Sequence, residues 1–434
     1  MSSNSKDNHH ITLLASLGSI IEYYDFVIYG MMASYLSAVF FPPQNPATAV
    51  LQTFLIFAMG YLARPLGGAV IGLIGDRFGR RPAFLLSTTL MALSTFMIAL
   101  LPSYETLGIY TVLLLVLFRI LQGLSFGGEL PGAMTIVSEF SLDHHQGRKT
   151  SLVIASTSLG ALLASGILYL ISTTLSQTEI LSWGWRLPFL GGGVLGLLLL
   201  FARNTIQETP IFLQSKTEDR KPLFFLLTDH KKTLFKGACL TSFMAALVIT
   251  NLYFPYFIPK YFSYTINNVY QGTTLSLIFV ILILPLTGIF ADKFSNKTKI
   301  LCWICGSYIL LSIPIFSLLL TSNQIALIVF LMIQQCYIAL FSASFFPTLT
   351  RIFPSQIRFT SIAICYNFSW ASMATLPLIY TSLLDLFESP WIVPIVLSGL
   401  AGISLLATLK IIQNKQINET SPQESNPIKY DLVG

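Results

Sequence analysis

Long apolar stretches alternate with short polar segments along almost the whole chain. A helix needs roughly 20 apolar residues to cross a hydrocarbon layer about 30 Å thick. By this measure the pattern predicts twelve membrane-spanning helices, near residues 13–41, 49–74, 83–101, 107–139, 149–175, 185–202, 235–258, 271–291, 299–320, 324–349, 357–383 and 391–411. The fourth span is longer than a straight crossing requires, so we expect a kink at Gly127, Gly128, Pro131 and Gly132.

Acidic residues interrupt the first apolar stretch, which reads SIIEYYDFVIYG from Ser19 to Gly30. Glu22, Asp25 and Tyr29 have the spacing i, i+3 and i+7, which puts them on one face of a helix. A carboxylate at the centre of a membrane helix costs about 3 kcal/mol. Ionisable residues in spans usually face the bundle interior and mark ion or substrate paths. The alternative is static ion pairing that holds helices in register.

The composition supports a chain that lies mostly in lipid. Of its 434 residues, 54% are hydrophobic and 10% are charged, and the mean hydropathy is +0.71. Soluble domains carry about 25% charged residues, so we predict an all-α polytopic membrane protein whose partner is the lipid bilayer. The basic residues form no nucleic-acid-like patch, the five cysteines are interpreted as small buried hydrophobes, and neither a cofactor nor a metal is expected.

The basic residues orient the predicted helices. Most of the 25 lysines and arginines fall in segments that share one side of the membrane, whereas Lys260 and Arg186 fall on the other. The positive-inside rule then predicts that both termini are cytoplasmic. Arg64 and Arg119 remain, and both lie inside predicted spans.

An internal repeat divides the chain. The segment GLIGDRFGRR, from Gly72 to Arg81, matches GIFADKFSNK, from Gly288 to Lys297. Each copy follows the second span of its half, and such repeats are typical of secondary transporters. We therefore predict a six-helix bundle over 1–203, a linker over 204–234, a second bundle over 235–411 and a tail over 412–434. A gating motif is expected at Gly72, Asp76, Arg77, Gly79, Arg80, Arg81, Gly288, Asp292 and Lys293; a plain basic turn is the alternative.

The repeat and its motifs resemble the major facilitator superfamily. More narrowly, the chain resembles the metabolite:proton symporter family, which includes carriers of proline/betaine, α-ketoglutarate, citrate and shikimate. The segments that carry this resemblance are EYYDFVIYG (22–30), FAMGYLARPLGG (57–68), FRILQGLSFGGE (118–129), WGWRLPF (183–189), ETPIF (208–212) and FPSQIRFTSIAICYN (353–367). The chain departs from the family at Tyr23, where tryptophan is usual, and at Leu130 and Pro131. These departures leave the substrate open.

The resemblance implies a twelve-helix fold of two six-helix halves related by a pseudo-two-fold axis. It further implies a monomeric secondary active transporter in the bacterial inner membrane, with protons and a small molecule as partners. We expect proton-coupled uptake of a small carboxylated or zwitterionic metabolite by alternating access. An exporter of the same fold is the alternative, although the fifth span, STSLGALLASGILYL, lacks the Gly-x₃-Gly-Pro of drug antiporters. A non-transporting receptor is a further alternative, and no H-E-x-x-H, G-x-S-x-G or Walker motif indicates an enzyme.

The buried polar residues supply the candidate site. For proton coupling we expect Asp25 or Glu129 with Arg119, because a carboxylate beside a guanidinium in a buried site can exchange a proton. The resemblance assigns Arg64 and Arg186 to a substrate carboxylate, although Arg186 could instead be an interfacial residue. The other predicted substrate-binding residues are Glu22, Tyr23, Tyr29, Gln122, Asn251, Tyr366 and Asn367; within single spans, such polar groups can also simply join helices.

Overall fold

The computed structural model describes residues 18–41, 46–78, 80–127, 146–203, 230–294, 297–353 and 358–420, and these residues are almost entirely helical. Residues 18–31 form the first helix, and α2 (Ala33–Phe40) continues it after a turn at Met32. The first half also contains α3 (Pro46–Phe78), α4 (Arg80–Leu100), α5 (Tyr104–Leu107), α6 (Ile109–Phe126), α8 (Gln146–Thr174), α9 (Gln177–Glu179), the π-helical turn η2 (Ile180–Gly184) and α10 (Arg186–Arg203).

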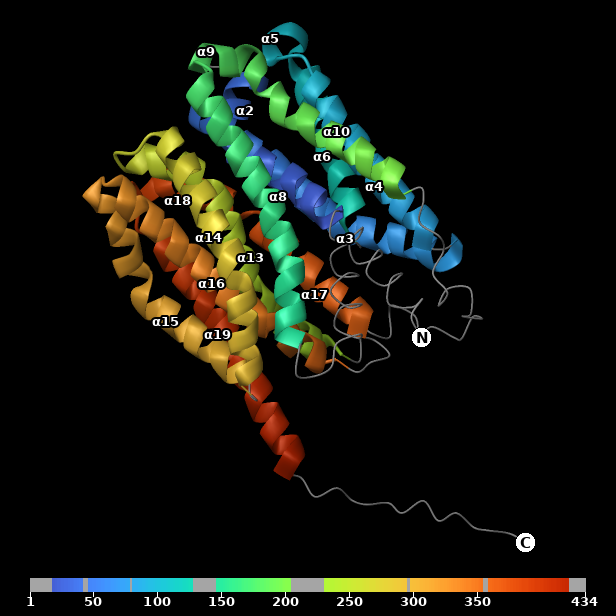
Figure 1. Cartoon of the computed structure of the whole chain (residues 1–434), viewed down its shortest axis with the longest axis vertical. Coiled ribbons are helices and arrows are strands. Elements are labelled where there is room, and N and C mark those ends of the chain that lie inside the picture. Colours follow the sequence, from blue (N-terminus) through green and yellow to red (C-terminus); the bar gives the residue numbers. More distant parts are fainter. Residues whose placement is uncertain are drawn as a thin grey trace.

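The second half begins with α13 (Lys231–Tyr261). It continues with α14 (Ile266–Lys293), α15 (Lys297–Ser317), the 3₁₀ turn η3 (Leu318–Thr321), α16 (Gln324–Arg351), α17 (Arg358–Met373), α18 (Leu376–Phe387) and α19 (Ile392–Thr420). Figure 1 shows α15, α16 and α19 on one side of the molecule and α4, α6 and α10 on the other, with α8, α13 and α14 between them. We call the end that carries α5 and α9 the distal end.

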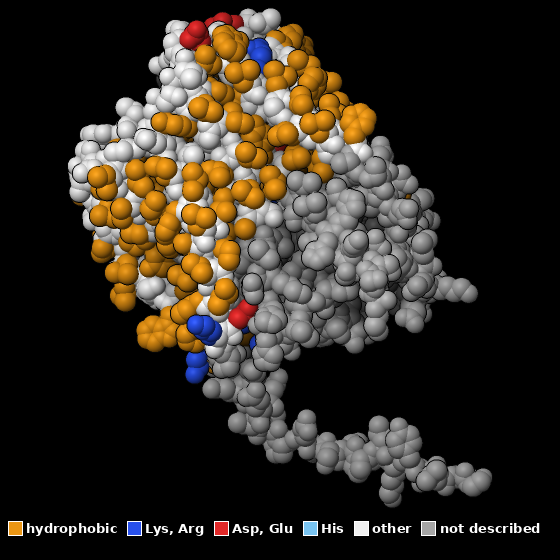
Figure 2. Space-filling view, viewed as in Figure 1, with side chains coloured by type: hydrophobic (Ala, Val, Ile, Leu, Met, Phe, Trp, Pro, Cys, Tyr) orange, Lys and Arg blue, Asp and Glu red, His pale blue; other side chains and the backbone are white. Residues whose placement is uncertain are grey.

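Nine helices in the described part of the chain are long and apolar enough to cross a membrane, and the bent pair Gln177–Gly184 and Arg186–Phe201 makes ten. Leu85–Leu100 is a shorter apolar helix, and with the first helix these elements correspond to the twelve predicted spans. Figure 2 shows charged side chains near the two ends of the visible face and an apolar band between them. This is the surface of a membrane-embedded bundle, so the predicted fold class is confirmed.

Local sequence signals explain where several helices begin and end. Ser176 and Glu179 form a reciprocal capping box at the start of α9, and Thr265 and Asn268 form another at the start of α14. Asn323 caps α16 through its side-chain oxygen. The capping residues lie in short connections, where the first backbone N–H groups of a helix lack partners in the preceding turn.

One detail differs from the predicted spans, and two predictions lie largely outside the described part. The eleventh span divides into α17 and α18, and Pro377 lies in the first turn of α18, where proline is tolerated. The kink expected in the fourth span concerns Gly127, the last described residue there, and residues 128–145, which lie outside the described part. The predicted linker lies mostly outside it as well, since α10 ends at Arg203 and α13 begins at Lys231.

The two halves meet along α8 and α14. Ser165 on α8 lies with its hydroxyl oxygen 2.8 Å from that of Thr274 on α14. The Tyr270 hydroxyl, one turn closer to the distal end on α14, donates a hydrogen bond to the Met31 carbonyl oxygen at 2.8 Å. Polar contacts therefore join the halves beside a space that both halves line.

Candidate functional site

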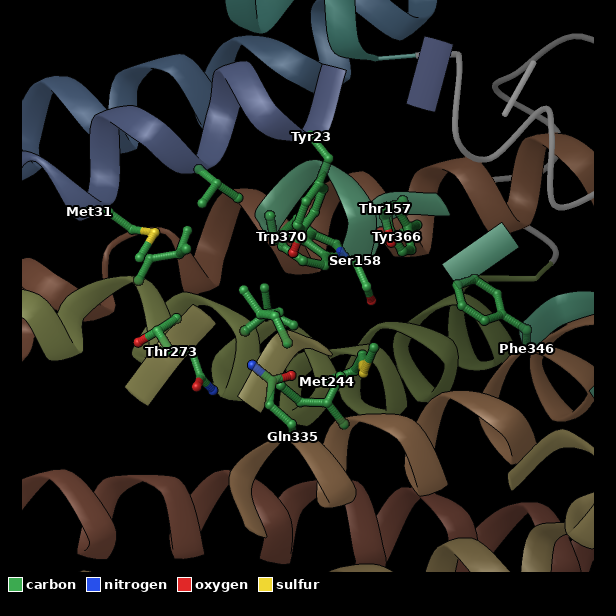
Figure 3. Close-up of a pocket in the computed structure, with 17 residues that line it drawn as sticks. Tyr23, Met31, Thr157, Ser158, Met244, Thr273, Gln335, Phe346, Tyr366 and Trp370 are labelled. Atoms are coloured by element: carbon green, nitrogen blue, oxygen red, sulfur yellow. The ribbon is translucent and has the colours of Figure 1, made fainter. Parts of the chain in front are cut away.

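A cavity lies between the two halves. The first helix and α8 of the first half line it, together with α13, α14, α16 and α17 of the second half. In Figure 3, Tyr23, Tyr366 and Trp370 cluster on one side of the cavity, whereas Thr273, Met244 and Gln335 lie on the other.

The described residues that line the cavity are mostly apolar, with several polar but uncharged side chains among them. It includes the hydroxyls of Thr157, Ser158 and Thr273 and the amides of Asn251 and Gln335, together with aromatic and aliphatic side chains. No lysine, arginine, aspartate, glutamate or histidine is among the lining residues in the described part. The cavity therefore offers hydrogen bonds and aromatic faces without a formal charge of its own.

The first helix presents different chemistry on its two faces. Tyr23, Val27 and Met31, spaced four residues apart, line the cavity. Asp25 and Tyr29 lie on the other face and contact α4, α6 and α3 within the first half. The face that carries Asp25 and Tyr29 thus points into the first bundle, and Tyr23 points into the cavity.

Asp25 is the centre of a buried hydrogen-bond network. Its Oδ2 accepts a hydrogen bond from the Thr95 hydroxyl at 2.5 Å and another from Gln122 Nε2 at 2.8 Å. Gln122 Oε1 in turn accepts a hydrogen bond from Arg119 Nη1 at 2.8 Å. Asp25, Thr95, Gln122 and Arg119 are all almost completely buried. The network connects a carboxylate to a guanidinium through one amide group.

Arg119 is held by aromatic rings as well as by Gln122. Its guanidinium carbon lies 4.2 Å from the centre of the Tyr29 ring and 5.0 Å from that of Phe26. The Nε and Nη2 atoms have no hydrogen-bond partner within the described part. Contacts between a cation and aromatic faces stabilise this buried charge by about 2 kcal/mol where water is excluded.

Arg64 lies in a cage of four aromatic rings. Its guanidinium carbon is 4.9 Å from the Phe126 ring centre, 5.1 Å from Tyr61, 5.4 Å from Phe26 and 5.9 Å from Trp370. Three of these rings belong to the first half, and Trp370 belongs to α17 in the second. Because Trp370 also lines the cavity, Arg64 lies directly behind the cavity wall.

The other predicted binding residues divide into two groups. Tyr23, Asn251 and Tyr366 line the cavity. Glu22 is buried, and Asn367 donates a hydrogen bond to the Gly127 carbonyl oxygen at 2.8 Å. The structure therefore brings part of the predicted set to the cavity and holds the rest in the surrounding helices.

Arg186 lies apart from the cavity lining. Its two terminal nitrogens donate hydrogen bonds to the carbonyl oxygens of Ser182 and Leu101, at 2.8 and 3.1 Å. Its guanidinium also lies 4.3 Å from the Trp185 ring centre. In this conformation Arg186 joins η2 to the segment after α4 at the distal end. Arg186 is not among the residues that line the cavity in this conformation.

The second copy of the repeat contains a buried ion pair. Lys297 Nζ lies 2.8 Å from Asp292 Oδ1, with both side chains largely shielded from solvent. Gly288 is buried, whereas Lys293 is exposed. The first copy is described less fully. Gly79 lies outside the described part, and so do the side-chain surroundings of Gly72, Asp76, Arg77, Arg80 and Arg81. The predicted proton-coupling residue Glu129 also lies outside it.

Three residues with evident roles in this geometry were absent from the predicted set: Thr95, Trp370 and Lys297. Thr95 gives no signal in sequence, because a lone threonine in an apolar helix usually bonds its own backbone. Lys297 aligns with Arg81 in the repeat, and that match was the available signal. Trp370 lies one turn after Tyr366, on the same face of α17.

Comparison with known proteins identifies the family. The profile of the family described as sugar (and other) transporter matches residues 11–226. The chain is 31% identical over 432 residues to the proline/betaine transporter of Escherichia coli (strain K12), covering 95% of this chain and 85% of that protein. The same identity and coverage hold for the glycine betaine/proline/ectoine/pipecolic acid transporter OusA of Dickeya dadantii (strain 3937).

Solved structures share the fold. The proton:xylose symporter XylE bound to 6-bromo-6-deoxy-D-glucose superposes with a TM-score of 0.73 at 19% identity, covering 94% of this chain and 96% of that one. A partially occluded, inward-open XylE from E. coli gives a TM-score of 0.71 at 20% identity, covering 93% and 97%. Together with the relatives, these matches confirm the resemblance seen in the motifs. The chain belongs to the metabolite:proton symporter family of the major facilitator superfamily and is a secondary transporter.

Proposed function

We propose that this transporter couples the uptake of a small zwitterionic or carboxylated metabolite to the entry of protons. The cavity between the halves binds the substrate, and Asp25 binds the proton. Both termini lie in the cytoplasm, and the protein works in the bacterial inner membrane as a monomer.

The observation that carries the proposal is the burial of Asp25 within the first half. A carboxylate there is costly when charged and unpaired, yet it accepts hydrogen bonds from Thr95 and Gln122 that favour the charged form. The opposed effects of burial and hydrogen bonding suit a group that gains and loses a proton during transport. Arg119, which is separated from Asp25 by the Gln122 amide, supplies a positive charge that compensates the carboxylate when the proton has left.

The chemistry of the cavity lining favours a zwitterionic substrate in particular. Moving a net charge into a site without a counter-charge is costly, whereas a zwitterion brings its own compensation. Aromatic faces attract a substituted ammonium group, and Tyr23, Tyr366 and Trp370 provide such faces. Arg64 behind Trp370 can approach a carboxylate. The named substrates of the relatives include betaine and proline, which are zwitterions.

Alternating access requires that one end of the interface opens while the other closes. At the distal end Phe54 of the first half packs against Tyr253 and Tyr256 of the second, with ring centres 5.3 and 5.9 Å apart. Tyr270 adds its hydrogen bond to Met31 nearby. These contacts fit a conformation closed at the distal end, in which substrate would leave toward the cytoplasm.

The test uses purified protein in liposomes with an imposed inward proton gradient. Radiolabelled glycine betaine and proline are the probes, and a protonophore is added in parallel. We expect accumulation that the protonophore abolishes. Asp25→Asn should lose accumulation but retain exchange of labelled for unlabelled substrate, because exchange needs no net proton movement.

Matched variants make the result specific. Asp385→Asn alters an exposed carboxylate, paired with Lys260, and should leave accumulation intact. Glu129→Gln tests the other predicted carboxylate. If Asp25→Asn and Glu129→Gln both still accumulate substrate, the proton assignment is wrong. Efflux driven by the same gradient would favour an exporter, and saturable binding without any flux would favour a receptor.

A further inference from the structure

Gln122 lies between a carboxylate and a guanidinium that do not touch. Its Nε2 donates a hydrogen bond to Asp25 Oδ2, and its Oε1 accepts one from Arg119 Nη1, both at 2.8 Å. Within the described part, no direct ion pair joins Asp25 to Arg119. One amide therefore separates the two opposite charges.

Both charged groups have unused bonding capacity. Asp25 Oδ1 has no hydrogen-bond partner in the described part, and neither Arg119 Nε nor Nη2 has one. These atoms are buried, and a buried polar group without a partner costs about 1–3 kcal/mol. A direct contact between Arg119 and Asp25 would satisfy both groups, yet the Gln122 side chain occupies the path between them.

Few other charges act on this carboxylate. On the first helix the titratable neighbours are Glu22, Tyr24 and Tyr29. On α4 the contact is Thr95, and on α10 it is Gly192, neither of which titrates. Arg119 on α6 is the adjacent cation. Arg64 on α3 lies beyond Phe26, since both guanidiniums contact that ring.

We propose that Gln122 is a positioning residue that keeps Arg119 from pairing directly with Asp25. The proposal rests on the proton-coupled function above. An adjacent cation favours the charged form of a carboxylate, so direct pairing would hold Asp25 ionised to lower pH. By interposing an amide, Gln122 keeps the carboxylate able to take up a proton, and displacement of the amide provides the route to the ionised, paired state.

Two substitutions separate this role from simple hydrogen bonding. Gln122→Leu removes the spacer and should let Arg119 reach Asp25. Thr95→Val removes a donor to the charged carboxylate and an acceptor for Gln122 Nε2, but it leaves the hydrogen bonds of Gln122 to Asp25 and Arg119. We expect Gln122→Leu to move protonation of Asp25 to lower pH by about one pH unit or more, and Thr95→Val to move it to higher pH. If Gln122 were only a donor, both variants would shift in the same direction.

Infrared difference spectroscopy of the reconstituted protein measures the test directly. The stretching band of a protonated buried carboxyl group is followed across a pH titration, and its absence in Asp25→Asn assigns it. Gln122→Met, which retains an unbranched side chain, serves if Gln122→Leu does not fold. Combining Gln122→Leu with Arg119→Met should reverse the acid shift, because no cation then remains to pair with Asp25.

The two proposals fail in different ways. If Asp25→Asn still accumulates substrate while wild-type accumulation depends on the proton gradient, the assignment of the coupling proton to Asp25 fails whatever Gln122 does. If Asp25 carries the coupling but the Gln122 variants shift its titration to higher pH or leave it unchanged, the spacer role is overturned and the proposed function stands.

Discussion

The guanidinium carbon of Arg64 lies 5.9 Å from the centre of the Trp370 ring, and this contact crosses from the first half of the bundle to the second. Trp370 also stacks against Tyr61, with ring centres 6.0 Å apart and planes inclined by 9°. The same tryptophan lines the cavity. A substrate that touches Trp370 therefore touches the group that holds Arg64 in place.

Replacement of Trp370 by leucine should weaken substrate binding. The substitution removes an aromatic face from the cavity and one wall of the Arg64 cage, and such contacts contribute about 1–2 kcal/mol. The expected result is a rise of about tenfold in the KM for glycine betaine uptake. Trp303→Leu is the matched control, because that side chain is 79% exposed on α15. An unchanged KM in Trp370→Leu would contradict a role for this residue in binding.

Helices α3 and α6 pack at backbone contact through two glycines. A Cβ atom at Gly123 would collide with the Gly60 carbonyl oxygen, and one at Gly60 would lie 3.1 Å from the Arg119 carbonyl oxygen. Gly123→Ala should therefore force the helices apart and displace Arg119, at a cost of about 1–3 kcal/mol. A lower temperature of thermal unfolding in detergent is the expected readout.

The control for this substitution is Gly306→Ala on α15, where an added Cβ meets nothing within 4 Å. Alanine favours a helix over glycine by up to about 1 kcal/mol, so this variant should be as stable as the parent or more so. Equal destabilisation by both substitutions would mean that the close contact between α3 and α6 does not limit stability.

Hydropathy and the repeated motif predicted the fold well, because each membrane span is selected for length and apolarity. The hydropathy pattern does not show where a helix bends or breaks within a span. The eleventh span reads as one apolar stretch, yet it contains the boundary between α17 and α18. A single proline can start a helix or kink one, so the sequence predicted a span there and not its break.

The site was harder to predict because the first helix carries polar residues on two faces, one toward the cavity and one toward the first bundle. In a surface helix, polarity separates the exposed face from the packed one. Here Tyr23 faces the cavity and is partly buried, whereas Asp25 faces the first bundle and is almost completely buried. The spacing of Asp25 and Tyr29 put them on one face, but only the packing of α3, α4 and α6 shows what that face contacts. Trp370 belongs to the second half of the chain and is far in sequence from the first helix, so no local sequence pattern indicates that the two lie close together.

Cysteines at positions 165 and 274 should lock the transporter. The native hydroxyl oxygens of Ser165 and Thr274 lie 2.8 Å apart across the two halves, so thiols at these positions should be close enough for a disulfide. If the distal end must open for substrate entry, oxidation of Ser165→Cys/Thr274→Cys should reduce uptake by about tenfold or more, and a reductant should restore it.

A second pair of cysteines controls for the effects of oxidation and cross-linking themselves. Ser312 and Ser398 have hydroxyl oxygens 2.7 Å apart, but both lie in the second half, on α15 and α19. Oxidised Ser312→Cys/Ser398→Cys should retain uptake, since a rigid half need not deform. Loss of transport in both pairs, with cross-linking verified by peptide mass, would argue against movement of the halves as rigid units.

The ion pair in the second copy of the repeat predicts a contrast between two lysines. Lys297 contacts Asp292 at 2.8 Å, with side chains 6% and 11% exposed, whereas Lys293 is exposed. Lys297→Gln should lower both the rate of uptake and the thermal stability, because it leaves a shielded carboxylate without this cation, and removal of one partner of a buried pair costs about 3–5 kcal/mol. Lys293→Gln should change neither, since an exposed charge contributes little. Uptake rates at saturating substrate and unfolding temperatures, measured on the same preparations, provide the comparison. If Lys293→Gln is the more damaging change, the motif acts through its exposed basic surface and the Asp292–Lys297 pair is incidental to transport.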